Sequence, residues 1–109
     1  MIYELRTYTA APGKLDRLHR RFRTVTLGLF EKHGMRVVGF WEPAGLDEGG
    51  GDLVYLLAHP TREAADAAWA AFRADAEWVR AKAASETDGP LAAKVVSRFL
   101  QPTDYSPLQ

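Results

Sequence analysis

The pattern of hydrophobic positions predicts a first helix over residues 13–33. Large apolar side chains recur there at every third or fourth position: Leu15, Leu18, Phe22, Val25 and Leu29. This spacing places them in one stripe along one face of an amphipathic helix. The arginines of the segment fall largely off that stripe: Arg17, Arg20, Arg21 and Arg23. Gly34 follows where a left-handed residue commonly ends a helix, so the segment has a clear stop.

Residues 61–84 form the second predicted helix, because the segment is rich in alanine, the strongest helix former. Thr61 stands at its start as an N-cap, whose hydroxyl can accept a hydrogen bond from a free backbone N–H group. Phe72 and Trp78 do not lie on one helical stripe. We therefore expect the helix to break near residues 74–75.

Four segments have the β-branched and aromatic composition of strands: residues 2–8, 35–41, 53–58 and 94–100. A glycine-rich stretch over residues 43–52 is expected to form a flexible connection between the second and third strands. The order of elements is β-α-β-β-α-β, which is the ferredoxin-like arrangement of the α+β class. Two right-handed crossovers then place both helices on one face of a four-stranded antiparallel sheet.

The second and third predicted strands carry apolar side chains on both faces. Along these strands Val37 and Trp41 alternate with Val38 and Phe40, and Leu53, Tyr55 and Leu57 alternate with Val54 and Leu56. Strands of this kind need cover on both faces, whereas the helices cover only one. We therefore predict a homodimer, in which the open sheet faces of two copies of the chain pack together.

Composition narrows the class of protein. A chain of 109 residues and 12.1 kDa allows one domain, predicted over residues 1–102 and followed by a tail over residues 103–109. Lys plus Arg total 14 and equal Asp plus Glu, and this zero net charge argues against a nucleic-acid partner. No apolar run approaches the ~20 residues of a membrane span, so no membrane partner is expected.

The chain contains no cysteine, which removes disulfides, thiolate nucleophiles and thiolate zinc ligands. Its first residues lead directly into a predicted strand, without the basic and apolar regions of a signal peptide. A reducing cytoplasm is therefore the expected location.

Several motifs resemble those of NIPSNAP-family domains. The opening Met-Ile-Tyr-Glu-Leu-Arg-Thr-Tyr and the Pro-Gly-Lys-Leu at 12–15 resemble the start of the family, and Gly-Phe-Trp at 39–41 stands where the family has a Gly-aromatic-Trp strand. Asp-Ala-Glu-Trp at 75–78 is similar to the family's Asp-Pro-Glu-Trp, with Ala76 in place of the proline. Residues 97–102 resemble the closing strand, so the resemblance covers nearly the whole predicted domain.

This resemblance implies a subunit of a dimeric α+β barrel, which agrees with the predicted homodimer, and a ligand cavity between the sheet and the helices. Relatives in that superfamily include cofactor-free quinone-forming monooxygenases, lactone isomerases, and haem-binding or haem-degrading proteins. The family has no agreed catalytic signature, so the resemblance assigns no catalytic residue here.

Histidines are the first candidates for proton transfer. His59 directly follows the third predicted strand and suits a general base, or else a loop histidine that caps the next helix or faces water. His33 suits the negative end of the first helix, and His19 suits a partly buried or interface position. The three histidines are 14 and 26 residues apart, without carboxylates at ligand spacing, so no metal site is expected.

A second group of candidates lies on the first strand, where Glu4, Arg6 and Tyr8 share one face. Tyr55 and Arg98, from the third and fourth strands, are expected to join them. One interpretation is a structural ion pair between Glu4 and Arg6 at the dimer seam or the sheet edge. In the other, Arg6 orients an anionic or phenolic substrate whose oxygen bonds to Tyr8 or Tyr55.

The resulting hypothesis is a small enzyme, free of metal and organic cofactors, that isomerises or oxygenates an aromatic or polyketide-like molecule. The predicted catalytic acid–base residues are His59 and Tyr55, and the predicted substrate-binding residues are Arg6, Tyr8, Trp41, Trp78 and Arg98. Five aromatic residues either line a pocket for a flat ligand or form plain core: Phe40, Trp41, Trp69, Phe72 and Trp78. One alternative function is a binding module without turnover, and another is a haem-binding protein with His19 or His33 as axial ligand.

Overall fold

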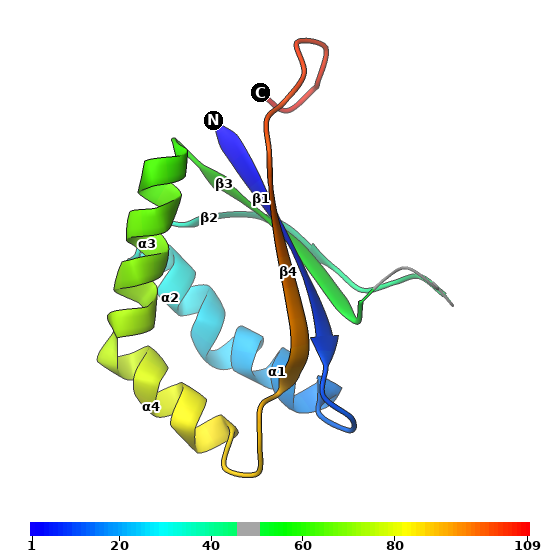
Figure 1. Cartoon of the computed structure of the whole chain (residues 1–109), viewed down its shortest axis with the longest axis vertical. Coiled ribbons are helices and arrows are strands. Elements are labelled where there is room, and N and C mark those ends of the chain that lie inside the picture. The colour runs from blue at the N-terminus through cyan, green and yellow to red at the C-terminus, as the bar shows by residue number, and fades with distance from the viewer. Residues whose placement is uncertain (46–50) are drawn as a thin grey trace.

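A computed structural model describes residues 1–45 and 51–109. The elements in chain order are β1 (Ile2–Ala10), α1 (Leu15–Arg21), η1 (Phe22–Thr26), α2 (Leu27–Lys32), β2 (Arg36–Trp41), β3 (Leu53–His59), α3 (Arg62–Ala74), α4 (Ala76–Ser85) and β4 (Ala92–Leu100). Figure 1 shows them along the chain, and the predicted β-α-β-β-α-β order is confirmed. Residues 46–50 of the predicted glycine-rich connection lie outside the described residues.

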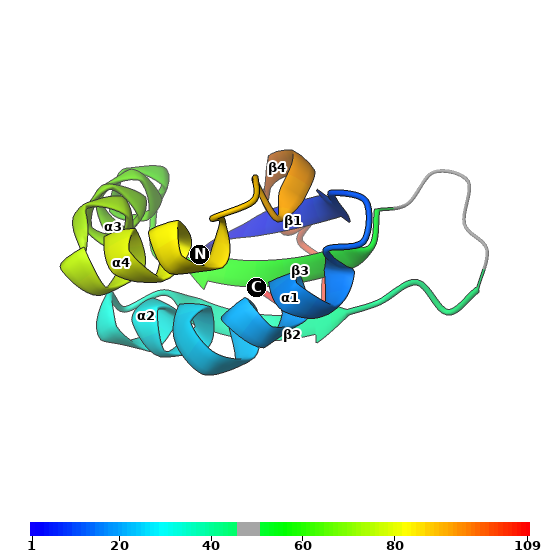
Figure 2. The same ribbon diagram turned by 90° about the horizontal axis from the view of Figure 1, so that it is seen from below.

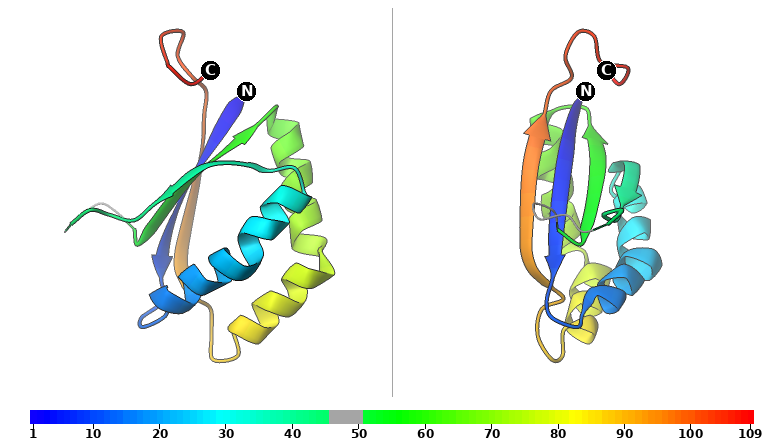
Figure 3. Two further views of the ribbon diagram at one scale, coloured as in Figure 1. Left: turned by 180° about the vertical axis from the view of Figure 1, so that it is seen from behind. Right: turned by 90° about the vertical axis from the view of Figure 1, so that its right-hand side faces the viewer.

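The four strands form one antiparallel sheet in the order β2-β3-β1-β4, and all the helices cover the same face of it. Figure 2 and both views of Figure 3 show the helices gathered on one side of the strands. The α+β ferredoxin-like fold predicted from the order of elements is thereby confirmed. None of the helices in the described part of the chain is long and apolar enough to cross a membrane.

The first helical segment is not one uniform α-helix, contrary to the expectation. A π-helical turn, η1, separates α1 from α2, and the hydroxyl of Thr26 donates to the carbonyl of Arg21, five residues earlier, at 3.3 Å. This wider turn shifts the buried face by one position, so that Thr26 is buried while Val25 is only half-buried. Arg21, three residues after the buried Leu18, is buried as well.

The predicted break in the second helix is confirmed. α3 ends at Ala74 and α4 begins at Ala76, with Asp75 between them in an extended conformation. The Asp75 carboxylate caps α4 through the backbone N–H of Glu77, and it also lies 2.8 Å from Lys32 and 2.8 Å from His33. These hydrogen bonds, that of Lys32 first, hold the pKa of Asp75 well below its usual value.

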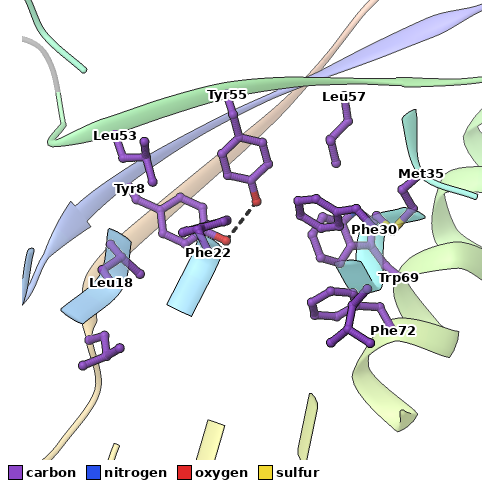
Figure 4. Packing of buried hydrophobic residues seen from close by; sticks show 12 residues of the cluster. Tyr8, Leu18, Phe22, Phe30, Met35, Leu53, Tyr55, Leu57, Trp69 and Phe72 are labelled. Carbon is purple, nitrogen blue, oxygen red and sulfur yellow. Dashed lines mark hydrogen bonds between the residues drawn. The ribbon is translucent and has the colours of Figure 1, made fainter. Parts of the chain in front are cut away.

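The core between the helices and the sheet is mainly aromatic (Figure 4). Phe40 stacks on Tyr55 with ring centroids 4.7 Å apart, and Phe30 sits between Tyr55, Trp69 and Phe72 at 5.5–5.8 Å. Edge-to-face and tilted contacts of this kind stabilise ring clusters beyond the area that they bury. The side chains that close the cavity described below are therefore held rigidly from several sides.

No helix covers the opposite face of the sheet, although at one end of it Tyr3 is buried and donates to the carbonyl of Gln109 in the C-terminal segment. Beside the polar Thr7, Lys94 and Arg98 this face carries many apolar side chains: Leu5, Val54 and Leu56 are half-buried, and Trp41, Val96 and Leu100 are exposed. Trp41 lies over Gly39, where an added Cβ would stand 2.8 Å from the indole ring. A β-bulge at Val38 turns both Val37 and Phe40 toward the helices, so the simple alternation predicted for this strand was wrong.

Candidate functional site

Arg6 is the centre of a polar network on the helix-covered face of the sheet. Its Nε donates to the hydroxyl of Tyr55 at 2.8 Å, and its Nη2 donates to the hydroxyl of Tyr8 at 3.1 Å. The two hydroxyls are themselves 3.1 Å apart, as the dashed line in Figure 4 shows. Tyr55 stands directly opposite Arg6 in the β1–β3 register, so the expectation that Tyr55 joins Arg6 and Tyr8 was correct.

The Arg6 guanidinium is held from two further sides. Its central carbon lies 4.2 Å from the centroid of the Trp69 ring, and its Nη1 donates to Oε2 of Glu4 at 3.2 Å. Burial opposes the positive charge, but Tyr55, Tyr8 and Glu4 together keep the pKa of Arg6 above its ordinary value. The cation is therefore permanent and pre-oriented.

Glu4 is 1% exposed and is surrounded by hydrogen-bond donors. Its Oε1 accepts from Trp69 Nε1 at 2.8 Å and lies 2.9 Å from His59 Nε2, while its Oε2 accepts from Ser97 Oγ at 2.7 Å and from Arg6. Burial raises the pKa of Glu4, yet the bonds from Trp69, Ser97 and His59 outweigh it, so the pKa is lowered overall. Glu4 is an ionised carboxylate that anchors Arg6.

Tyr55 is the buried partner of the two phenols, and its side chain is closed off from water. Burial, followed by the neighbouring Tyr8, raises the pKa of Tyr55 well above the usual value for a phenol. Tyr55 therefore stays protonated. In that form its hydroxyl can donate to Tyr8 while it accepts from Arg6.

A cavity of about 300 Å³ lies between the sheet and the helices, next to this network. Arg6 and Tyr8 line it from β1, and its aromatic lining consists of Phe22, Phe30, Trp69, Phe72 and Trp78. Phe22 and Thr26, at the two ends of η1, both face it, so the π-helical turn shapes one wall. A cavity that combines aromatic faces with convergent polar groups is the usual form of a small-molecule site.

The other predicted site residues divide between the two faces of the sheet. Trp78 lines the cavity, as expected, and the Arg21 guanidinium lies 4.9 Å from its ring centroid. Arg98 lies on the opposite face, so its predicted place beside Arg6 was wrong; Trp41, also a predicted substrate-binding residue, lies on that face too and does not line this cavity. Arg98 pairs with Leu5, which is one residue out of phase with Arg6, and neighbours in register share a face.

His59 is buried behind Glu4 and does not line the cavity. It is 2% exposed, which overturns the interpretation of a loop histidine that faces water. The cap of the following helix is supplied instead by Thr61, whose hydroxyl accepts from the Ala64 backbone N–H. His59 therefore belongs to the group of side chains that fix Glu4.

His19 and His33 lie away from this cavity. His33 bonds to Asp75, and His19 lines a separate hollow of about 330 Å³ beside Trp41 at the β2 edge. Within the described residues, no group of three or more His, Cys, Asp or Glu side chains could hold a metal ion.

Two residues of the site escaped prediction from the sequence. Ser97 bonds to Glu4, and Arg21 lines the cavity although it was expected off the buried stripe. Trp69 was among the aromatic candidates for a pocket and lines it, but its bond to Glu4 was not expected. Ser97 stands opposite Arg6 in the β1–β4 register, so a correct strand alignment would have found it. Arg21 stands three residues after Leu18, beside the buried stripe, so this spacing could have found it despite its charge.

Comparisons with known proteins agree with this fold. The family model described as NIPSNAP matches residues 3–107. An uncharacterized NIPSNAP domain protein from Burkholderia xenovorans is 22% identical with a TM-score of 0.80, over 98% of this chain and 99% of that one. A NIPSNAP family protein from Agrobacterium tumefaciens is 19% identical with a TM-score of 0.82, over 99% and 98%.

A more distant similarity is to a mutant of MhuD, crystallised with two manganese protoporphyrin IX molecules per active site. It is 15% identical with a TM-score of 0.61, over 94% of each chain. No curated protein matches the sequence.

Proposed function

This chain belongs to the NIPSNAP family, and from that premise we propose that it binds a small flat aromatic or polyketide-like molecule and isomerises or oxygenates it without a cofactor. The observation that carries the proposal is the Arg6–Tyr8–Tyr55 network beside an aromatic cavity of about 300 Å³. Ring faces would hold the body of the ligand, and the polar network would bind its oxygen.

Arg6 has the hydrogen-bonding capacity that this role requires. A guanidinium carries five N–H donors, and Tyr55, Tyr8 and Glu4 use three of those of Arg6. Among the described residues two are left for a ligand oxygen. A fixed cation stabilises an enolate or phenolate oxygen more than the neutral oxygen, so it favours removal of a proton from an acidic C–H or phenol.

Tyr8 is the proposed catalytic residue, since it lines the cavity and Arg6 donates to its hydroxyl. Tyr55 and His59, the residues first predicted to be catalytic, act from behind it. Tyr55 passes a hydrogen bond to Tyr8, and His59 orients Glu4, which in turn anchors Arg6. His59 is thus a positioning residue in this proposal.

A binding module without turnover is the second candidate, and one observation favours it. Glu86 is the one carboxylate among the described residues that line the cavity, and it is paired with Arg21 at 2.6 Å; no histidine lines it. A strong free base is therefore lacking at the wall. The same lining disfavours haem with His19 or His33 as axial ligand, because neither histidine reaches this cavity.

We also propose that a second copy of the chain covers the open sheet face. Trp41, which is 53% exposed, together with Val96 and Leu100 makes that face apolar, and such patches mark contact surfaces. A cytoplasmic location suits the absence of cysteine.

A probe with an acidic C–H tests the proposal. 2-Tetralone is flat and bicyclic, and exchange of its acidic protons in D₂O can be followed by NMR. We expect the protein to accelerate that exchange and Tyr8→Phe to lower the acceleration at least about tenfold. Tyr105→Phe, at a phenol that is 84% exposed, is the matched control and should exchange like wild type.

Measuring the binding of 2-tetralone together with its proton exchange separates the enzyme from the binding module. Saturable binding of 2-tetralone with exchange at the uncatalysed rate would identify a binding module. Exchange that Tyr8→Phe leaves unchanged would show the catalytic assignment to be wrong. Arg6→Met should weaken binding, whereas Arg80→Met, at an exposed arginine of α4, should not.

A further inference from the structure

The charges that line the cavity are unevenly distributed between its walls. Opposite the sheet, Arg21, Arg73 and Lys82 line it, together with a single carboxylate, Glu86. Glu86 is already neutralised by Arg21 at 2.6 Å. Across residues 1–45 and 51–109, no carboxylate lies within salt-bridge distance of Arg73 or Lys82. The helix-side wall therefore carries unbalanced positive charge.

Arg21 adds a buried donor that has no acceptor. Its side chain is 8% exposed, and its Nη1 donates to Ser85 Oγ at 3.1 Å and to Glu86. Its Nε has no hydrogen-bond partner among the described residues. A buried N–H group without a partner is destabilising, so a ligand oxygen that reached it would be bound with a net gain.

We propose that the ligand of this cavity is an aromatic acid with two anchored ends. One oxygen, enolic or phenolic, bonds to Arg6 and Tyr8 on the sheet side. An anionic group lies on the helix side, where Arg21, Arg73 and Lys82 stabilise its charge. The inference rests on the function proposed above and specifies the substrate class of that same cavity.

The electrostatics favour an anion over a neutral aromatic molecule of the same shape. Arg6 is already balanced by Glu4, so the excess charge lies on the helix side. Cations in a partly enclosed, low-dielectric cleft concentrate anions there. Carboxylate, sulfonate and phosphate share the required chemistry, because each offers acceptor oxygens and negative charge to an arginine donor.

Two fluorescent probes that differ in one group test this inference. 8-Anilinonaphthalene-1-sulfonate carries an acidic group, and N-phenyl-1-naphthylamine has the same aromatic body without it. At low salt we expect the sulfonate to bind about tenfold more tightly, because one charged hydrogen bond accounts for a factor of that size. Raising the NaCl concentration to 0.5 M should remove most of this difference and leave the neutral probe unaffected.

Variants then locate the sulfonate. Arg73→Gln combined with Lys82→Gln should weaken its binding about tenfold, and Arg21→Met should do so by at least as much. Neither change should alter the affinity of the neutral probe. Arg80→Gln is the control: it removes an exposed charge from α4, the helix that also carries Lys82, and this variant should bind both probes like wild type. Thermal melting checks that each variant is folded. If Arg21→Met unfolds, the double variant still tests the inference, because Arg73 and Lys82 are exposed and their replacement should not disturb the fold.

Each outcome has a distinct meaning. If both probes bind equally well and the variants change neither affinity, the anionic ligand is wrong while the cavity stands. If the sulfonate binds tightly and the variants leave its affinity unchanged, it binds elsewhere and the inference also fails. If neither probe binds, the cavity is not a ligand site, and the proposed function fails together with this inference.

Discussion

The two faces of the sheet differ most along β1, whose charged side chains point to the helix-covered face. The helix-covered face buries Glu4, Arg6 and Tyr8, whereas the face without helices presents Leu5 from the same strand and the exposed Trp41. Charges are tolerated under the helices because each has partners there, and an unpaired charge would be strongly destabilising. Exposed apolar groups on the open face favour association, because a partner would remove them from water. We propose ligand chemistry for the first face and association for the second.

Removing the Glu4 carboxylate from the polar face should have the largest effect on stability. Glu4→Ala leaves the Arg6 charge uncompensated and removes the acceptor of Trp69, Ser97 and His59. We expect the free energy of unfolding, measured in urea, to fall by about 3–5 kcal/mol.

Glu42→Ala is the control for that substitution, since the Glu42 side chain is 69% exposed. It should change stability by less than about 0.5 kcal/mol. Equal losses from Glu4→Ala and Glu42→Ala would contradict the anchoring role of Glu4.

Breaking the apolar face should change association rather than folding. Leu56→Asp places a charge in the middle of the open face, next to Leu5 and Gly39 in register. By sedimentation we expect wild type to be a dimer and this variant to dissociate at about hundredfold higher concentration. Val79→Asp, at an exposed apolar position of α4, should remain a dimer. A monomeric wild type would show that no second copy covers this face.

Lowering the pH should destabilise the polar face of the sheet, because it protonates Glu4. The pKa of Glu4 is lower in the folded chain than the 4.5 of an unperturbed glutamate, so protons bind preferentially to the unfolded chain. The stability contributed by Glu4 is present above pH 4.5 and is lost as the pH falls through the folded pKa.

Urea titrations between pH 5 and pH 2.5 should therefore show a steeper loss of stability for wild type than for Glu4→Gln. The variant keeps some dependence on pH, since Lys32 and Arg17 respectively lower the pKa values of Asp75 and Asp88. Identical slopes for the two proteins would mean that Glu4 is not ionised in the fold.

The smallest effect is expected from removing one hydroxyl of the network. Tyr55→Phe keeps the ring packing against Phe40 but deprives Arg6 Nε of its acceptor, and we expect a loss of about 1–2 kcal/mol in thermal or urea unfolding. Tyr105→Phe should leave stability unchanged. A Tyr55→Phe variant as stable as wild type would show that water replaces the lost hydroxyl.

Local signals in the sequence predicted most of the fold and part of the site. The break beside Asp75 and the cap at Thr61 follow from stripe geometry and capping chemistry, which involve only near neighbours. Alternation along β1 placed Arg6 and Tyr8 on one face for the same reason. Arg98 was misplaced because its face depends on the register between β1 and β4, which no local pattern reveals.

The sequence by itself determined the order of the elements, the ends of the helices and the shared face of Glu4, Arg6 and Tyr8, because these depend on backbone periodicity and on residues close in the chain. Only the tertiary structure decided that Tyr55 meets Arg6 and that Trp69 closes over both Arg6 and Glu4. Those contacts join segments about fifty or more residues apart, and their geometry is set by strand register and helix packing. The polar network exists because the aromatic core brings these distant groups together, and packing is a property of the whole chain.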